Sequence, residues 1–272
     1  MRIGGSTRLL AVLGDPVAHS LSPVMHNAAI AALGIDAVYV ALRTPSATVP
    51  DTLTTLTGLG VAGNVTVPLK GAAERCVARK TDLCTRTGSC NTFWVEQGTL
   101  VGDNTDAPAI AAELKELGVA AGRWLVLGTG GSARAVAIAA SFAGAELLVQ
   151  SREPTRAKAF AEWASAQGAH ATPAHGVDSV EVIVNATPLG LRDGDALPLN
   201  DAAPRGLQAA LDLVYRRGTT RWVQALARHG VPARDGRGVL VRHGALAWQR
   251  FFPTESPPIE VMRAAVERAL RA

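Results

Sequence analysis

The chain has 272 residues, of which 48% are hydrophobic and 18% charged, which is enough apolar material for the cores of two domains. Its net charge of +4 is spread along the chain without a basic run, which argues against nucleic-acid binding. No apolar run reaches the roughly 18–20 residues of a membrane span, and no signal-peptide pattern precedes the first polar residues. We therefore expect a cytoplasmic protein with no membrane partner.

The first hundred residues alternate between strand and helix patterns and end in a hairpin. We expect strands at 8–15, 37–42 and 62–67, helices at 22–34, within 45–59 and from Pro68 onward, and a hairpin over 89–106 that turns at Gln97-Gly98. In the first of these helices Ser22 can act as the N-cap, Pro23 suits the first position and Gly34 ends the helix.

Lys70 occupies an awkward position for an ordinary lysine. Pro68 suits the first position of a helix, which puts Lys70 in the first turn, where the dipole disfavours a cation by roughly 0.3–1 kcal/mol. The chain has 23 Arg but only 4 Lys, and a lysine, unlike an arginine, can lose its proton. Lys70 is therefore either a solvated surface residue or a group placed for proton transfer.

The second half of the chain alternates regularly between strand and helix. We expect helices at 107–118, 154–168, 220–230 and 257–272, a strand, Gly-rich turn, helix and strand within 123–152, and strands at 180–187 and 209–215. Alternation of this kind with apolar strands predicts a parallel, doubly wound α/β sheet.

The Gly-rich turn within 123–152 has the spacing of a dinucleotide-binding turn. Gly128, Gly130 and Ala133 follow a strand and open a helix, so Gly128 allows a tight turn and Gly130 lets a pyrophosphate approach the helix N-terminus. The alternative is a Gly-rich turn of an α/β fold that binds no ligand.

Two arginines after the next strand favour NADP over NAD. An NAD site places an acidic residue there, whereas Arg152 and Arg156, expected on one helix face, suit a 2′-phosphate. Glu153 lies between them and argues in the other direction. The alternative is that both arginines are solvated surface residues.

The remaining polar residues have local explanations when each is taken alone. Ser20 and Ser22 flank a helix N-terminus, which is a ready carboxylate site, although Ser22 can be only a cap. Asn91 can be a polar strand end and Asp106 a turn residue. Cys76, Cys84 and Cys90 are expected to be reduced thiols, and the histidines lack metal-ligand spacing, so we predict no metal site.

Taken together, the motifs of this chain resemble those of the shikimate dehydrogenase family. They occur in the family's order from about residue 11 to about 250: GDPVAHSLSPVMHN, NVTVPLK, NTFW with GDNTD, GTGGSAR, NATPLG, DLVYRRGTT and DGRGVLV. The resemblance implies two α/β domains with a cleft between them: a substrate-binding domain of 1–106 plus 239–272 and a Rossmann-type NADP-binding domain of 107–238.

The resemblance also assigns roles to individual residues. It makes Lys70 and Asp106 the catalytic pair. The residues assigned to the substrate are Ser20 and Ser22 at its carboxylate, and Thr66, Asn91 and Tyr215 at its ring. Those assigned to the cofactor are Gly128, Gly130, Gly131, Ser132, Ala133 and Arg134 at the pyrophosphate, Ser151, Arg152 and Arg156 at the adenosine phosphate, and Asn185, Thr187 and Gly238 near the nicotinamide.

The implied reaction is the reversible reduction of 3-dehydroshikimate to shikimate with NADP(H), in the shikimate pathway of aromatic amino acid biosynthesis. A homodimer is a separate expectation. This chain departs from the family pattern at His243, where a substrate-binding glutamine is usual, and at Ser151 and Glu153, where asparagine and threonine are usual. These departures keep open a quinate/shikimate or aminoshikimate dehydrogenase using NAD or NADP. A non-catalytic nucleotide-binding sensor is a more remote alternative.

Overall fold

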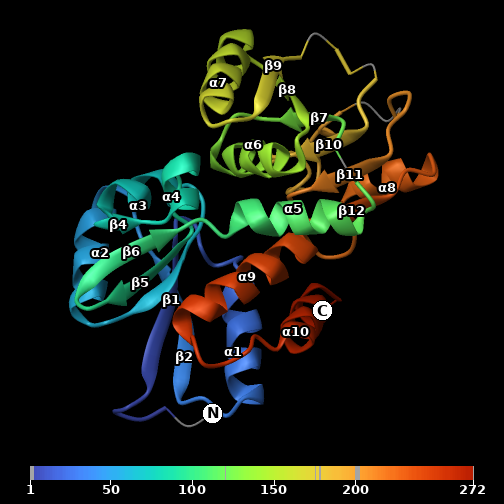
Figure 1. The fold of residues 1–272 in the computed structure, drawn as a ribbon. Helices are drawn as coiled ribbons and strands as arrows, with labels where there is room; N and C mark the ends of the chain where they lie inside the picture. The colour runs from blue at the N-terminus through green and yellow to red at the C-terminus, as the bar shows by residue number, and fades with distance from the viewer. Residues whose placement is uncertain (1–2, 120, 175, 178, 200–202, 272) are drawn as a thin grey trace. The chain divides into compact units, whose positions relative to one another are not determined.

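The computed structural model describes residues 3–119, 121–174, 176–177, 179–199 and 203–271. The chain divides into two compact units, one of Met1–Thr105 with Leu240–Ala272 and the other of Asp106–Val239. Each unit contains a six-stranded sheet with helices packed on it (Figure 1), which confirms the predicted α/β fold class. Within the described residues no helix is long and apolar enough to cross a membrane.

The sheet of the first unit is mixed, in the order β2-β1-β3-β5-β6-β4. Its strands are β1 (Arg8–Gly14), β2 (Ala37–Arg43), β3 (Ala62–Val65), β4 (Arg79–Lys80), β5 (Thr92–Glu96) and β6 (Thr99–Asp103). Strand β1 pairs in parallel with β2 and β3, whereas β5 runs antiparallel to β3 and β6. The predicted turn between β5 and β6 is present, with positive φ at Gln97 (51°) and Gly98 (74°), as a type I′ hairpin requires.

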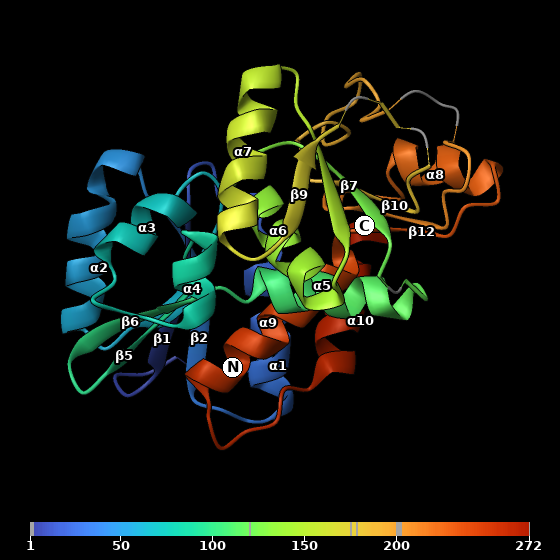
Figure 2. The same ribbon diagram turned by 45° about the horizontal axis from the view of Figure 1, so that its top comes forward.

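Helices cover both faces of this sheet (Figures 1 and 2). They are α1 (Ser22–Ala32), α2 (Val49–Gly58, after the 3₁₀ turn Ser46–Thr48), α3 (Lys70–Cys76), α4 (Asp82–Thr87), the C-terminal part of α9 (Arg237–Phe251) and α10 (Ile259–Arg271). On one face, Leu53 of α2 and Ala73 of α3 share an apolar core with Leu13 of β1. On the other, α1 packs against β1, β2 and α10.

Two helices of this unit start one or two residues away from the predicted position. Helix α3 begins at Lys70 and not at Pro68, because Pro68 lies inside a turn that the Leu69 N–H closes on the Thr66 carbonyl at 2.9 Å. Helix α1 has Leu21 as its N-cap, so Ser22 is its first residue and not its cap. Gly34 follows the helix with φ of 64°, as predicted.

Helix α9 was not predicted from the sequence pattern, because glycines interrupt it. A Cβ atom at Gly238 would collide with the Glu113 carboxylate, and one at Gly244 would collide with the end of Met25. Each glycine therefore lets a neighbouring side chain approach the helix backbone closely. Packing outweighs the roughly 1 kcal/mol that a glycine costs in a helix.

The second unit has a fully parallel sheet in the order β12-β11-β10-β7-β8-β9. Its strands are β7 (Arg123–Leu127), β8 (Glu146–Gln150), β9 (His170–Pro173), β10 (Val182–Asn185), β11 (Ala209–Asp212) and β12 (Ala233–Asp235). Counted from β7, this is the strand order 3-2-1-4-5-6 of dinucleotide-binding folds. The predicted parallel, doubly wound sheet is therefore found in this unit.

The described residues of the second unit form the helices α5 (Asp106–Glu116), α6 (Gly131–Ala143), α7 (Pro154–Ala166) and α8 (Arg221–Arg228), and α9 begins at its end. Figure 1 shows α6 and α7 on one face of the sheet and α8 on the other. Helix α5 packs on α6, and Trp222 and Leu226 of α8 share the opposite core with Leu125 and Ile183. Strand β11 ends at Asp212, so Tyr215 lies in the following loop and not in the strand predicted at 209–215.

Candidate active site

One edge of the first unit's sheet carries most of the residues predicted to bind substrate. Because β5 is antiparallel, its first residue lies beside the carboxyl ends of β1, β3 and β6: Leu13 pairs with Val65, and Thr92 pairs with both Asn64 and Asp103. Ligand sites of α/β sheets form at this edge. The predicted residues found there are Ser20 and Ser22 after β1, Thr66 and Lys70 after β3, and Asn91 before β5.

The segment after β1 lies against the turn after β3. A Cβ atom at Gly14 would come within 2.5 Å of the Thr66 methyl group, so glycine is needed where the two segments approach. The Ser20 hydroxyl accepts a hydrogen bond from the Ser22 N–H at 3.3 Å. Ser22 is buried and Ser20 is half-buried. Ser20 therefore takes the local role at the start of α1 that the sequence suggested for Ser22.

Lys70 is fixed at its backbone to the segment that carries Asn91. Its carbonyl oxygen accepts a hydrogen bond from the Cys90 N–H at 2.9 Å, and the Val65 N–H donates to the Asn91 carbonyl at 2.9 Å. As predicted, Lys70 stands in the first turn of its helix, where it is half-buried. Asp106 begins α5 in the second unit, directly after Thr105, and is buried.

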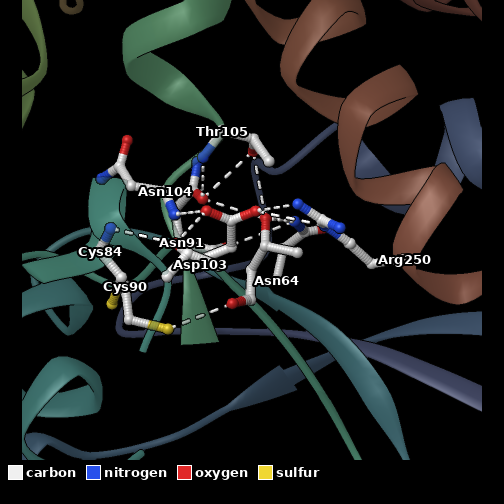
Figure 3. Close-up of polar contacts among 10 residues, drawn as sticks. Asn64, Cys84, Cys90, Asn91, Asp103, Asn104, Thr105 and Arg250 are labelled. Carbon is white, nitrogen blue, oxygen red and sulfur yellow. Dashed lines mark hydrogen bonds and ion pairs between the residues drawn. The ribbon is translucent and has the colours of Figure 1, made fainter. Parts of the chain in front are cut away.

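The Asn91 side chain is the centre of a buried polar network (Figure 3). Its Oδ1 atom accepts hydrogen bonds from the Thr105 N–H at 2.8 Å, the Thr105 hydroxyl at 3.1 Å and the Thr92 hydroxyl at 3.0 Å. Its Nδ2 atom is buried and has no hydrogen-bond partner among the described residues. Asn64 and Thr92, which hold this network, were not predicted as site residues.

Asp103 ties the end of β6 to α9 (Figure 3). Its carboxylate accepts hydrogen bonds from the Thr81 hydroxyl at 2.5 Å, the Asn104 N–H at 2.8 Å and the Arg250 guanidinium at 3.1 Å. Arg250 also lies over the Trp94 ring at 5.2 Å. These contacts fix the segment that leads into Thr105.

His243 lies on α9 near a second, buried histidine. His26 of α1 is fully buried and stacks on Tyr39, with ring centroids 4.4 Å apart. Burial, with the electrostatic influence of His243, lowers the pKa of His26 to about 3, so His26 stays neutral. His243 itself is half-buried.

The residues predicted to bind the cofactor follow the carboxyl ends of the second unit's strands. Gly128 follows β7, Ser151 and Arg152 follow β8, Asn185 ends β10 with Thr187 after it, and Gly238 follows β12. Tyr215, which was predicted to bind the substrate, follows β11. Strands β7 and β10 are adjacent in the sheet. From β7 the chain continues to β8 and β9 on one side, and from β10 it continues to β11 and β12 on the other side. This is the switch point at which doubly wound sheets bind nucleotides.

The two glycines of the predicted dinucleotide turn have different explanations. Gly128 has φ of 106°, and its Cβ would lie 3.2 Å from the Ala186 carbonyl, so the fold itself requires glycine there. Gly130, the N-cap of α6, has an ordinary φ of −85° and nothing within 4 Å of a Cβ. No side chain of the described residues lies in that space, so it is open to a ligand.

The start of α6 suits an anion. Gly131, Ser132, Ala133 and Arg134 form its first turn, which contains no acidic side chain, so the backbone N–H groups at the helix start and the dipole favour a phosphate. The Arg134 guanidinium lies over the Trp163 ring of α7 at 4.8 Å. This stacking keeps a cation beside the turn.

Arg152 and Arg156 do not share a helix face, which corrects the prediction. Arg152 lies in the loop before α7, and Arg156 lies in the first turn of that helix. Both are exposed, and Arg156 forms an ion pair with Glu153 at 3.0 Å. The Ser151 hydroxyl accepts a 3.4 Å hydrogen bond from the Glu153 N–H. Glu153 therefore competes directly with any phosphate for Arg156.

Asn185 shapes the loop after β10 with both of its polar atoms. Oδ1 accepts hydrogen bonds from the Thr187 N–H at 3.0 Å and the Thr187 hydroxyl at 2.6 Å, while Nδ2 donates to the Leu189 carbonyl at 3.1 Å and to Asp212 at 2.8 Å. Its amide thus has a structural role in positioning Thr187. Gly238 likewise has a packing role, because the Glu113 carboxylate occupies the place of a side chain there.

Asp212 makes the stability of the second unit dependent on pH. Burial raises the pKa of this carboxyl from 3.8 to about 6, although Thr220, Asn185 and Val214 donate hydrogen bonds to it. Since its pKa is higher in the folded than in the unfolded chain, its contribution to stability is complete below about pH 3.8 and is lost as the pH rises through about 6.

We expect the variant Asp212→Asn to remove this dependence. Between pH 4 and 7 the free energy of unfolding of the wild type, relative to the variant, should fall by up to about 3 kcal/mol. Urea denaturation of both proteins across this range measures the difference. Parallel stability curves would contradict the assignment.

The three cysteines are free, as predicted; Cys84 and Cys90 are buried and Cys76 is half-buried. A hydrogen bond with Cys84, together with burial, raises the pKa of Cys90 well above its usual value, so Cys90 remains a thiol. Its Sγ atom lies 3.2 Å from the Thr92 carbonyl. The described part of the chain contains no cluster of three or more His, Cys, Asp or Glu side chains that could hold a metal ion.

Comparison with known proteins gives matches along nearly the whole chain. Residues 12–93 match the family model described as the shikimate dehydrogenase substrate binding domain. A shikimate dehydrogenase (NADP(+)) of Thermus thermophilus is 40% identical over 94% of this chain and 98% of its own length. The protein of the same name from Methanothrix thermoacetophila is 37% identical over 97% of this chain and 98% of its own.

Solved structures match equally fully. The crystal structure of shikimate 5-dehydrogenase from Thermus thermophilus in complex with NADP(H) and shikimate has a TM-score of 0.88, with 39% identity over 96% of this chain and 99% of that one. A shikimate dehydrogenase in complex with NADP+ has a TM-score of 0.91, with 26% identity over 100% and 98% of the two chains.

Proposed function

Because the chain belongs to the shikimate dehydrogenase family, we propose that it catalyses the reversible, NADP-dependent reduction of 3-dehydroshikimate to shikimate. The observation that carries this proposal is the gathering of Ser20, Ser22, Thr66, Lys70 and Asn91 at one edge of the first unit's sheet. Relatives named shikimate dehydrogenase (NADP(+)) support both the reaction and the cofactor.

The two units divide the binding of the two ligands. The first unit holds the substrate: Ser20 and Ser22 bind its carboxylate through their hydroxyls, and Thr66, Asn91 and His243 contact its ring, together with Tyr215 of the second unit. The second unit holds NADP(H) through the turn at Gly128–Arg134 and through Arg152 and Arg156. A cleft between the domains, a homodimer and a cytoplasmic location stay predictions.

The protein's part in the chemistry is to orient the substrate and move one proton. NADPH, when bound, supplies the hydride that reduces the ring ketone. Lys70 donates a proton to the ketone oxygen during reduction and accepts it from the hydroxyl during oxidation. Asp106 holds Lys70 and the reacting hydroxyl in place. Asn91 donates a hydrogen bond from its otherwise unpartnered Nδ2.

A grid of substrates and cofactors tests the proposal. We expect the highest kcat/KM for shikimate with NADP⁺, when shikimate, quinate and aminoshikimate are each assayed with NAD⁺ and NADP⁺. Absence of turnover in every combination would contradict an enzyme and favour the nucleotide-binding sensor.

The presence of His243 is the reason to assay quinate and aminoshikimate beside shikimate. An imidazole can donate or accept one hydrogen bond, whereas the glutamine usual in the family does both at once through its amide. A kcat/KM for quinate or aminoshikimate above that for shikimate would identify the alternative dehydrogenase. A preference for NAD⁺ would show that Glu153 neutralises the arginine pair.

A further inference from the structure

The orientation of the Asn91 carboxamide is fixed by its neighbours. The Thr105 N–H can only donate, so the atom it contacts at 2.8 Å must be the carbonyl oxygen of the amide. The hydroxyls of Thr105 and Thr92 contact the same oxygen, at 3.1 and 3.0 Å. Nδ2 therefore points away from these three donors. It is buried and has no partner among the described residues.

A chain of hydrogen bonds with a single direction leads into this amide. The Tyr39 hydroxyl donates to Asn64 Oδ1 at 2.7 Å, which leaves Asn64 Nδ2 as a donor. That nitrogen donates to the Thr92 hydroxyl at 3.1 Å and to the backbone carbonyl oxygen of Asn91 at 3.1 Å. Having accepted this bond, the Thr92 hydroxyl donates its own proton either to Asn91 Oδ1 at 3.0 Å or to the Thr105 hydroxyl at 3.1 Å, which lies 3.1 Å from the same oxygen. Both routes end at Asn91 Oδ1.

The first member of the chain is held in place by packing. Tyr39 is buried, and its ring stacks on His26 with an interplanar angle of 10°. His26 in turn stacks on Trp248 of α9, with centroids 6.2 Å apart. Burial raises the pKa of Tyr39 well above its usual value, so its hydroxyl remains a donor. The direction of the chain is therefore the same at any working pH.

We infer that Tyr39, Asn64 and Thr92 are positioning residues that lock the Asn91 carboxamide so that Nδ2 is presented as a donor to a hydroxyl or carbonyl oxygen of the substrate. A buried donor left unpaired is costly, and an oxygen of a bound ligand removes that cost. The inference rests on the proposed function for the identity of the ligand, and on the contacts above for the locked amide.

The variant Thr92→Val tests the chain, because valine has nearly the same shape and lacks the hydroxyl. We expect the KM for shikimate to rise about 3- to 10-fold, while kcat and the KM for NADP⁺ change less than about 2-fold. Thr92→Ser, which keeps the hydroxyl, is the matched control and should behave as the wild type. Tyr39→Phe, which removes only the distant end of the chain, should raise the KM by a smaller factor.

A double-mutant cycle separates positioning from loss of stability. In an Asn91→Ala background, Thr92→Val should change the KM for shikimate less than about 2-fold, because the group that it orients is absent. An unchanged KM in Thr92→Val, or an equal rise of the KM in both backgrounds, would overturn the inference.

Atomic-resolution crystal structures test the locked amide without any need for turnover. Because the Thr105 N–H still donates to Oδ1 in Thr92→Val, the Asn91 carboxamide should keep its orientation there but shift or occupy more than one position, whereas it should occupy a single position in the wild type and in Thr92→Ser. An unchanged, single position of the carboxamide in Thr92→Val would refute the positioning role. Failure of the proposed function is distinguishable, since it would show as an inactive wild type in the substrate grid.

Discussion

Replacing Lys70 by alanine is expected to lower kcat for shikimate oxidation about 10²- to 10⁴-fold, with little change in either KM. The reason is that a positioned acid–base group acts in the transition state, whereas the substrate's carboxylate and ring contacts are made in the ground state as well. Steady-state kinetics with shikimate and NADP⁺ measure the effect. The chain is well suited to the test because it contains only 4 lysines.

Lys80→Ala is the matched control within the same unit. Lys80 forms an ion pair with Glu74 at 2.5 Å near the surface, and such pairs contribute about 0–1 kcal/mol. Its loss should leave kcat and both KM values near those of the wild type. Retained turnover in Lys70→Ala, with only a weaker KM for shikimate, would contradict the acid–base role.

The second large effect is expected at the arginines after β8. The double variant Arg152→Ala/Arg156→Ala should raise the KM for NADP⁺ about 10²-fold or more, because each charge-assisted hydrogen bond to a phosphate contributes about 1.5–3 kcal/mol. The kcat/KM for NAD⁺, which has no 2′-phosphate, should be nearly unchanged. Assaying the wild type and the double variant with both cofactors gives the change in the preference for NADP⁺ over NAD⁺, as a ratio of kcat/KM values.

A substitution at Glu153 should change the KM for NADP⁺ in the opposite direction and is therefore a control. Arg156 pairs with Glu153 at 3.0 Å, so Glu153→Gln should free the guanidinium and lower the KM for NADP⁺ by a few-fold. If the double arginine variant lost NADP⁺ and NAD⁺ equally, the arginines would have a structural role. The preference for NADP would then need another source.

The fold could be predicted largely because its signals are local. A few consecutive residues are enough to predict the apolar strands between amphipathic helices, the Gln97-Gly98 turn and the turn at Gly128. Helix α9 could not be predicted in this way, because Gly238 and Gly244 are explained only by Glu113 and Met25, which lie far away in the sequence. The start of α3 at Lys70 was likewise set by a turn that closes on Thr66.

The residues of the candidate site likewise fall into those that local sequence reveals and those that depend on distant contacts. Polar residues directly after predicted strands, such as Thr66 and Lys70, were found from the sequence and its family resemblance. Asn64 and Thr92 were missed because their roles depend on the pairing of β3 with β5, which brings together residues 28 positions apart. An alternating strand pattern predicts that a residue faces inward, but it does not reveal what that residue will meet.

The reversed direction of β5 has a consequence for how accurately the substrate can be recognised. Parallel strands bring to the ligand edge of a sheet their last residues and the loops that follow them, and loops differ in length and are mobile. Asn91 comes just before a strand that starts at that edge, and its N–H and carbonyl are both bonded to neighbouring strand segments, at Asp103 and Val65. The Asn91 side chain, which we propose contacts the substrate, is therefore held by hydrogen bonds of the sheet. The loops around it are free to diverge without displacing it.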